Sequence, residues 1–158
     1  MKPGRIILSI ALAVFALARF ASTCAKNEEQ RIVRQFNNGC TLIENQRAEV
    51  LTFSPYDKDS IEWMAVRTRQ LNNTVDSCIK YYQDIYKQDE DRYKGYLSIL
   101  FQYKKMVYLY QGWVKFNRDT DPEEKKKTYS LKLNTFRTEI RNVLFEKDHK
   151  AIENMLNR

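Results

Sequence analysis

The chain has 158 residues, 43% of them hydrophobic, and a formal net charge of +7. This length is sufficient for one domain with its own hydrophobic core. Its single histidine excludes metal and catalytic sites that need two histidines, and its four widely separated glycines exclude a glycine-rich phosphate loop. We therefore expect a single domain that carries no cofactor.

The first 25 residues have the pattern of a secretion signal. Lys2 and Arg5 precede an uncharged apolar run at residues 6–18, and small residues follow it. The run is shorter than the roughly 20 residues that a membrane span needs. We expect residues 1–25 to be a signal peptide that is cleaved on export, and residues 26–158 to form one helical domain with no transmembrane span.

Cys24 lies next to the expected cleavage point, and its fate decides the compartment. Cleavage after Ala25 would remove it, whereas a lipoprotein signal would leave it as the acylated first residue. The third alternative is a retained thiol. Ala21 and Thr23 match the lipoprotein pattern poorly, because that pattern needs a leucine or branched residue three positions before the cysteine.

The expected mature chain is less basic than the whole. Loss of Lys2, Arg5 and Arg19 leaves 24 basic residues against 20 acidic ones, a net charge of +4. Residues 91–158 alone carry +6, which favours anionic partners. A solvated helix surface explains these charges better, however, and we expect the lysines at 125–127 to be exposed to water.

Apolar residues recur at helical spacing through most of the chain. Residues 28–51 read as a helix broken near Asn37–Gly39, where two asparagines and a glycine form a breaker cluster, and Thr41 with Glu44 resembles a capping box that restarts it. From Asp59 to residue 86, apolar residues alternate in steps of three and four.

Two further helices complete the expected fold. One spans about residues 91–116, and the other begins at Thr120-Asp121-Pro122, where a capping residue precedes a first-turn proline. Four amphipathic segments with short connections predict an all-α, antiparallel bundle of about four helices, preceded by the signal segment.

Cys40 and Cys78 are an even pair in the expected mature chain. In an oxidising compartment such a pair predicts one disulfide. Measured from a hairpin near Asp57, the two cysteines differ in height by about 6 Å, close to the upper limit for a bridge. The alternative is two separate buried thiols.

The third helix carries aromatic residues at regular intervals. Tyr96, Tyr103 and Tyr110 recur every seven residues, and Trp113 follows them. Together they could line a ligand groove or a partner surface. The alternative is that the rings belong to the core and only their hydroxyls reach water.

Few residues are suited to catalysis. Glu146 and His149 have the spacing of a helical metal motif, but such sites need the motif twice. We therefore expect no metal and no enzymatic activity. Asn72-Asn73-Thr74 is a sequon that makes Asn72 a glycosylation candidate if the organism is a eukaryote.

These observations lead to one functional expectation with two alternatives. We expect a secreted, non-enzymatic helical bundle that acts by binding another macromolecule, and we expect a protein partner because export argues against nucleic acid. One alternative is a small carrier that holds an apolar ligand between its helices. The other is a periplasmic or lipid-anchored envelope protein attached through Cys24.

Overall fold

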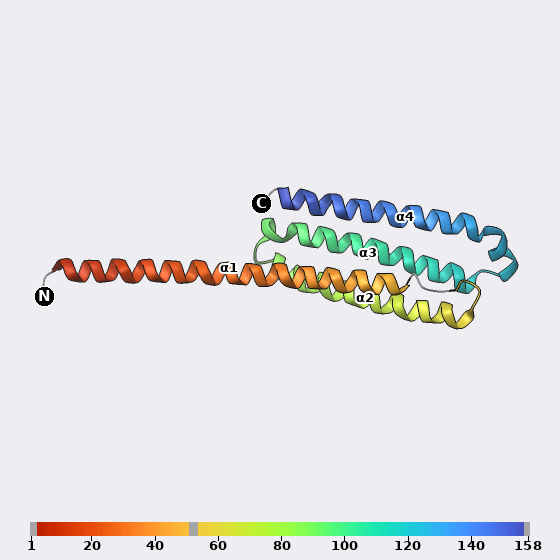
Figure 1. Ribbon diagram of the computed structural model, residues 1–158, viewed down its shortest axis with the longest axis horizontal. Coiled ribbons are helices and arrows are strands. Elements are labelled where there is room, and N and C mark those ends of the chain that lie inside the picture. Colours follow the sequence, from red (N-terminus) through yellow and green to blue (C-terminus); the bar gives the residue numbers. More distant parts are fainter. Residues whose placement is uncertain (1–2, 51–53, 157–158) are drawn as a thin grey trace. The chain divides into compact units, whose positions relative to one another are not determined.

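The computed structural model describes the backbone of residues 3–50 and 54–156, and side chains in the ranges 25–50, 54–91 and 93–149. These residues form four α-helices and no strand, which confirms the all-α class and is consistent with a four-helix bundle (Figure 1). The helices are α1 (Pro3–Val50), α2 (Lys58–Tyr86), α3 (Glu90–Asp119) and α4 (Pro122–Leu156).

The chain divides into two compact units, Met1–Asn38 and Gly39–Arg158. The first consists of the N-terminal part of α1. The second contains the last turns of α1 together with α2, α3 and α4, and the sites described below belong to it unless stated otherwise. Within this second unit, α2, α3 and α4 run antiparallel to their chain neighbours (Figure 1).

The break predicted in the first helix is wrong, because α1 continues through Asn37, Asn38 and Gly39. Asparagine and glycine cost a helix up to about 1 kcal/mol each, but unlike proline they keep the backbone N–H that continues the hydrogen-bond ladder. Gly39 also has a packing role. A Cβ at this position would lie 3.2 Å from the Cys78 Sγ atom, so the missing side chain leaves room for Cys78.

The starts of α2 and α4 are defined by aspartate caps. The Asp57 carboxylate accepts a hydrogen bond from the Ser60 backbone N–H at 3.0 Å, which places the start of α2 slightly before the predicted Asp59. Asp121 accepts from the backbone N–H groups of the second and third residues of α4, and Pro122 occupies the first position. The predicted boundary at Asp121 and Pro122 is therefore confirmed.

Helix α3 is the central element of the core, because it packs against both α2 and α4. Buried side chains cover most of its circumference, which explains why its sequence has only a weak one-sided apolar pattern. Its buried residues are Tyr93, Tyr96, Leu97, Ile99, Leu100, Gln102, Tyr103, Met106, Val107, Tyr110, Trp113, Val114 and Asn117.

Lys125 is buried, although the sequence predicted a solvated lysine there. Its ammonium donates to the backbone carbonyl of Asn117 in the last turn of α3 and, at 3.2 Å, to that of Pro55 in the loop before α2. A cation suits carbonyls at a helix C-terminus, which otherwise lack partners. One side chain thus links α4, the end of α3 and the loop between α1 and α2.

Candidate functional site

The tyrosines that recur every seven residues point into the interior. Tyr96, Tyr103, Tyr110 and Trp113 are all buried, with exposed fractions between 0% and 9%. The Trp113 ring stacks on Phe136 of α4 at a centroid distance of 5.0 Å, and Tyr110 meets the same phenylalanine edge-on at 5.5 Å. The rings therefore fill the space between helices and offer no surface to a protein partner in this structure. The core alternative also expected their hydroxyls to reach water, but that of Tyr103 donates to Glu44 and that of Tyr110 is buried.

Around Tyr103, polar groups from three helices form a network that the sequence did not predict. We use the name polar network for Glu44 and Arg47 of α1, Tyr103 of α3 and Lys147 of α4. The Glu44 carboxylate accepts from the Tyr103 hydroxyl at 2.8 Å, from the Lys147 ammonium at 2.8 Å and from the Arg47 guanidinium at 2.6 Å. Lys147 also donates to the Tyr103 oxygen at 3.2 Å.

Burial and hydrogen bonding set the ionisation of these groups. Burial alone would raise the pKa of Glu44, but the hydrogen bonds from Lys147, Tyr103 and Arg47 reverse this and hold it below its usual value. Burial is the main cause that raises the pKa of the Tyr103 hydroxyl, and its hydrogen bond to Glu44 raises it further. At neutral pH Glu44 is therefore a carboxylate and Tyr103 a neutral phenol, and both already bond to other members of the polar network.

The predicted disulfide is absent, since both Cys40 and Cys78 carry free thiols. The Cys78 Sγ atom packs against the backbone of Gly39, whereas the Cys40 thiol is directed to the hydroxyl of Tyr103. Burial, with a contribution from Cys78, raises the pKa of Cys40 to about 11, so its thiol is a poor nucleophile at neutral pH.

The sequon asparagine is part of a second polar cluster. Asn72 lies within α2, and its side-chain N–H₂ donates to Asp76 at 3.0 Å. The Lys104 ammonium of α3 donates to the Asn72 oxygen at 2.8 Å and to the Asp76 carboxylate at 2.6 Å. The amide nitrogen that a glycan would modify is therefore engaged in the folded chain.

The other residues considered from the sequence do not come together. His149 is exposed and stacks on the Phe145 ring at 6.2 Å, while Glu146 instead accepts from Lys105 at 3.2 Å. In the described part of the chain, no group of three or more His, Cys, Asp or Glu side chains could hold a metal ion. The side chain of Cys24 lies outside the described residues.

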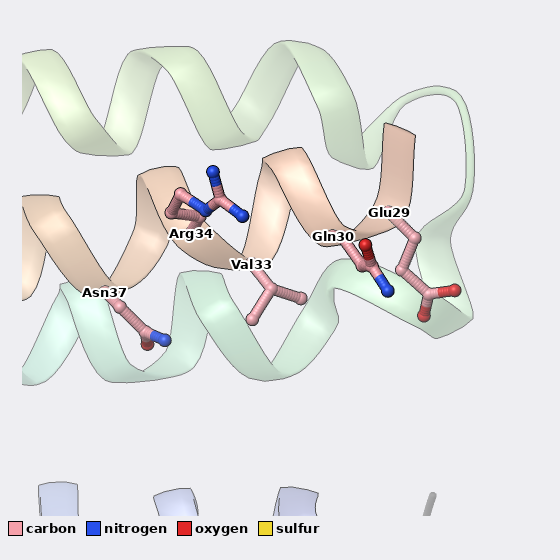
Figure 2. Close-up of a pocket in the computed structure, with 5 residues that line it drawn as sticks. All are labelled: Glu29, Gln30, Val33, Arg34 and Asn37. Atoms are coloured by element: carbon pink, nitrogen blue, oxygen red, sulfur yellow. The ribbon is translucent and has the colours of Figure 1, made fainter. Parts of the chain in front are cut away.

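A surface depression of about 460 Å³ lies on α1, in the first unit. Figure 2 shows its lining residues, Glu29, Gln30, Val33, Arg34 and Asn37, along one stretch of this helix. Side chains from one helix alone cannot surround a ligand, and small-molecule sites are usually enclosed clefts. We therefore do not assign a binding site to this depression.

The outward side of α3 carries a surface that the sequence analysis missed. Phe101 is 45% exposed and Tyr108 is 59% exposed, and exposed lysines lie between and beside them. At 100° per residue these positions fall on one side of the helix. We call this set the outer stripe; it consists of Lys94, Ser98, Phe101, Lys105, Tyr108, Gly112 and Lys115.

A shallow groove of about 360 Å³ borders the outer stripe. Asp76 and Ile79 of α2 line one wall, and Phe101, Lys104, Lys105 and Tyr108 of α3 line the other. Lys104 is held by Asp76 and lies 5.3 Å from the Tyr108 ring centroid, a cation–π contact that fixes this ring at the rim. The groove therefore combines apolar rings with both signs of charge.

Comparison with known proteins gives no relative for this chain. No protein-family model matches it, and no curated protein and no solved structure shows significant similarity. Within the described residues, none of the helices contains a stretch long and apolar enough to cross a bilayer. The class that the fold defines is an all-α helical bundle.

Proposed function

We propose that this protein is exported and acts, without catalysing a reaction, by binding another macromolecule. The proposal of export rests on the basic residues and apolar run within residues 1–25. The observation that carries the proposal of binding is the outer stripe, where two aromatic rings are exposed on the most buried helix of the bundle. Exposed aromatic side chains are the residues on which protein interfaces most depend.

The polar network supports a role other than catalysis. Glu44, Lys147 and Tyr103 are the groups best suited to acid–base chemistry, yet they bond to one another and connect α1, α3 and α4. A carboxylate already occupied by three donors is a structural group rather than a general base awaiting substrate. The carrier alternative has less support, because rings expected to hold an apolar ligand pack on aromatic residues of the neighbouring helices instead: Tyr96 on Tyr82 of α2, and Tyr110 and Trp113 on Phe136 of α4.

The experiment tests export and binding on one sample. The protein recovered from the medium of its own cells should have an intact mass that begins at Lys26. A mass that begins at an acylated Cys24 would indicate a lipid-anchored envelope protein, and protein confined to cells with residues 1–25 intact would contradict export. Native mass spectrometry of the same sample would reveal any bound apolar ligand, which would favour the carrier.

The binding test uses the tagged protein as bait in that medium, with partners identified by mass spectrometry and then rebound in purified form. We expect capture by the wild type and its loss in the Phe101→Ala, Tyr108→Ala double variant. Phe145→Ala is a matched control, because Phe145 is a 71% exposed aromatic residue on α4. Capture that survives the double variant but not the control would overturn the assignment of the surface.

A further inference from the structure

The outer stripe has the spacing of a surface that packs along another helix. Its seven positions follow one another in alternating steps of four and three residues, from Lys94 to Lys115. This alternation is the pattern by which two helices interlock along their lengths. At 1.5 Å per residue the stripe extends over about 30 Å. A row of regularly spaced side chains of this length matches the surface of another helix better than that of a flat membrane.

The charge of the outer stripe indicates the sign of the charge that its binding partner should carry. Between Asp91 and Asp119 the sequence contains six basic residues and no acidic one. Among the described residues, neither Lys94 nor Lys115 has an ion-pair partner. Lys105 pairs with Glu146 at 3.2 Å, but both side chains are about half exposed, and such pairs contribute little and exchange readily. The stripe therefore presents uncompensated positive charge beside its two rings.

A second copy of this chain is a poor occupant. If two outer stripes packed on each other, the lysines of one would face the lysines of the other, and like-charge contacts across an interface cost free energy. An occupant with carboxylates at these places would gain free energy instead. The groove beside the stripe offers Ile79 and the faces of Phe101 and Tyr108 to its apolar side chains.

We propose that the outer stripe of α3 binds an acidic amphipathic helix of a partner protein. The apolar side of that helix covers Phe101 and Tyr108, and its carboxylates approach Lys94, Lys105 and Lys115. This inference rests on the proposed function, because it names the kind of macromolecule that the protein binds. It corresponds to recognition in which a helix lies in a groove and is held by residues at regular helical spacing.

The test uses two synthetic peptides of four heptads with leucine at the first and fourth positions. In one, glutamate occupies the positions that flank the leucine seam, and in the other lysine occupies them. Fluorescence anisotropy of labelled peptide measures binding to the full exported chain. We expect the acidic peptide to bind and the basic peptide not to bind, with affinity that falls as salt rises.

Three variants locate the interaction. The double variant Phe101→Ala, Tyr108→Ala should lower the affinity for the acidic peptide by roughly tenfold or more, while Phe145→Ala should leave that affinity unchanged. Lys94→Glu, Lys115→Glu removes no ion pair of the folded chain, and it should reverse the preference so that the basic peptide binds better. Circular dichroism of each variant controls for loss of helix.

Several results would overturn the inference. One is failure of the acidic peptide to bind the folded wild type. Another is equal binding of both peptides, or a preference that survives the charge reversal. Binding to phosphatidylserine vesicles that depends on the same residues, with no peptide binding, would assign the stripe to a membrane surface. If a native partner requires Phe101 and Tyr108 while the acidic peptide does not bind, the proposed function stands and only the helical partner is wrong.

Discussion

Two pairs of aromatic residues on α3 have the same spacing and opposite surroundings. Tyr103 and Tyr110 lie seven residues apart and are buried, whereas Phe101 and Tyr108 lie seven residues apart and are exposed. An offset of two residues is a rotation of about 200° around a helix, so the pairs occupy opposite sides. Spacing alone therefore does not show which aromatic series belongs to the core. That depends on which side of α3 the neighbouring helices cover.

The sharpest test of this comparison is truncation of one ring from each pair. Tyr110→Ala should destabilise the fold by about 3–5 kcal/mol, because it leaves a cavity at a fully buried site beside Phe136. Tyr108→Ala should change the free energy of unfolding by less than about 1 kcal/mol, since its ring is mostly in water. Urea unfolding measures both, and similar losses at the two sites would contradict the assignment of inner and outer sides.

A second test measures how well the inner side protects the thiol that faces Tyr103. The pKa of Cys40 is about 11 rather than 9.0, so at pH 8 its thiolate fraction and alkylation rate should be about a hundredfold lower than for an unperturbed thiol. Iodoacetamide labelling of the chain with Cys78 intact, read out as alkylation of the Cys40 peptide by mass spectrometry, follows this residue and keeps the contribution of Cys78 to its pKa. The same protein in denaturing guanidinium chloride is the control, and equal rates in both conditions would show that the thiol is not protected.

A third test removes the charge at the centre of the polar network. Glu44→Gln should destabilise the fold by about 1–3 kcal/mol at neutral pH, because two cations lose their charged acceptor. The folded pKa of Glu44 is lowered, so its stabilisation is complete above about pH 4.5 and is lost as pH falls through the folded value. The difference between wild type and variant should therefore shrink on acidification.

Glu49→Gln on the same helix is the matched control for this experiment. Glu49 pairs with Arg67 at 3.4 Å, and both side chains are a little under half exposed, so its substitution should cost less than about 0.5 kcal/mol. A larger cost at Glu49 than at Glu44, or a difference between wild type and Glu44→Gln that does not change with pH, would show that the network does not stabilise the bundle as described.

The smallest expected effects come from two helical glycines. Gly112 lies on the outer stripe, and no atom lies within 4 Å of the place that a Cβ would occupy there, so Gly112→Ala should stabilise the fold by up to about 1 kcal/mol. Gly39→Ala should gain less, because the new methyl group meets the Cys78 Sγ atom at 3.2 Å. In a Cys78→Ala background, Gly39→Ala should recover the gain seen at Gly112. Thermal unfolding of the four variants checks this coupling.

The sequence predicted the number and class of the helices better than their ends. Steps of three and four residues revealed α2, and the Asp121-Pro122 boundary was correct because capping chemistry is local. The break at Asn37–Gly39 was wrong because the local propensity cost is small and packing against Cys78 depends on contacts that a linear pattern does not contain. The solvated Lys125 was wrong for the same reason: its partners, Asn117 and Pro55, come from two other segments.

The outer stripe could have been predicted from the sequence, but the tyrosines that recur every seven residues on the same helix are a more conspicuous pattern. Phe101 and Tyr108 share a seven-residue interval with Lys94 and Lys115, just as the buried tyrosines share theirs. The lack of acidic residues between Asp91 and Asp119 was the independent clue. The polar network had no comparable signal, since Glu44, Tyr103 and Lys147 lie far apart in the chain and each is typical of a solvated helix by itself.

Helix α4 depends on fewer buried side chains than the helix it covers. Within residues 122–149 the buried side chains are Lys125, Phe136 and Ile140, and α4 packs chiefly on α3. Segments with little buried apolar surface open at a lower free energy than the whole fold. Amide hydrogens of α4 should therefore exchange before those of α3, and a protease should first cut a form in which α4 has detached and left the rings of Tyr110 and Trp113 open to water.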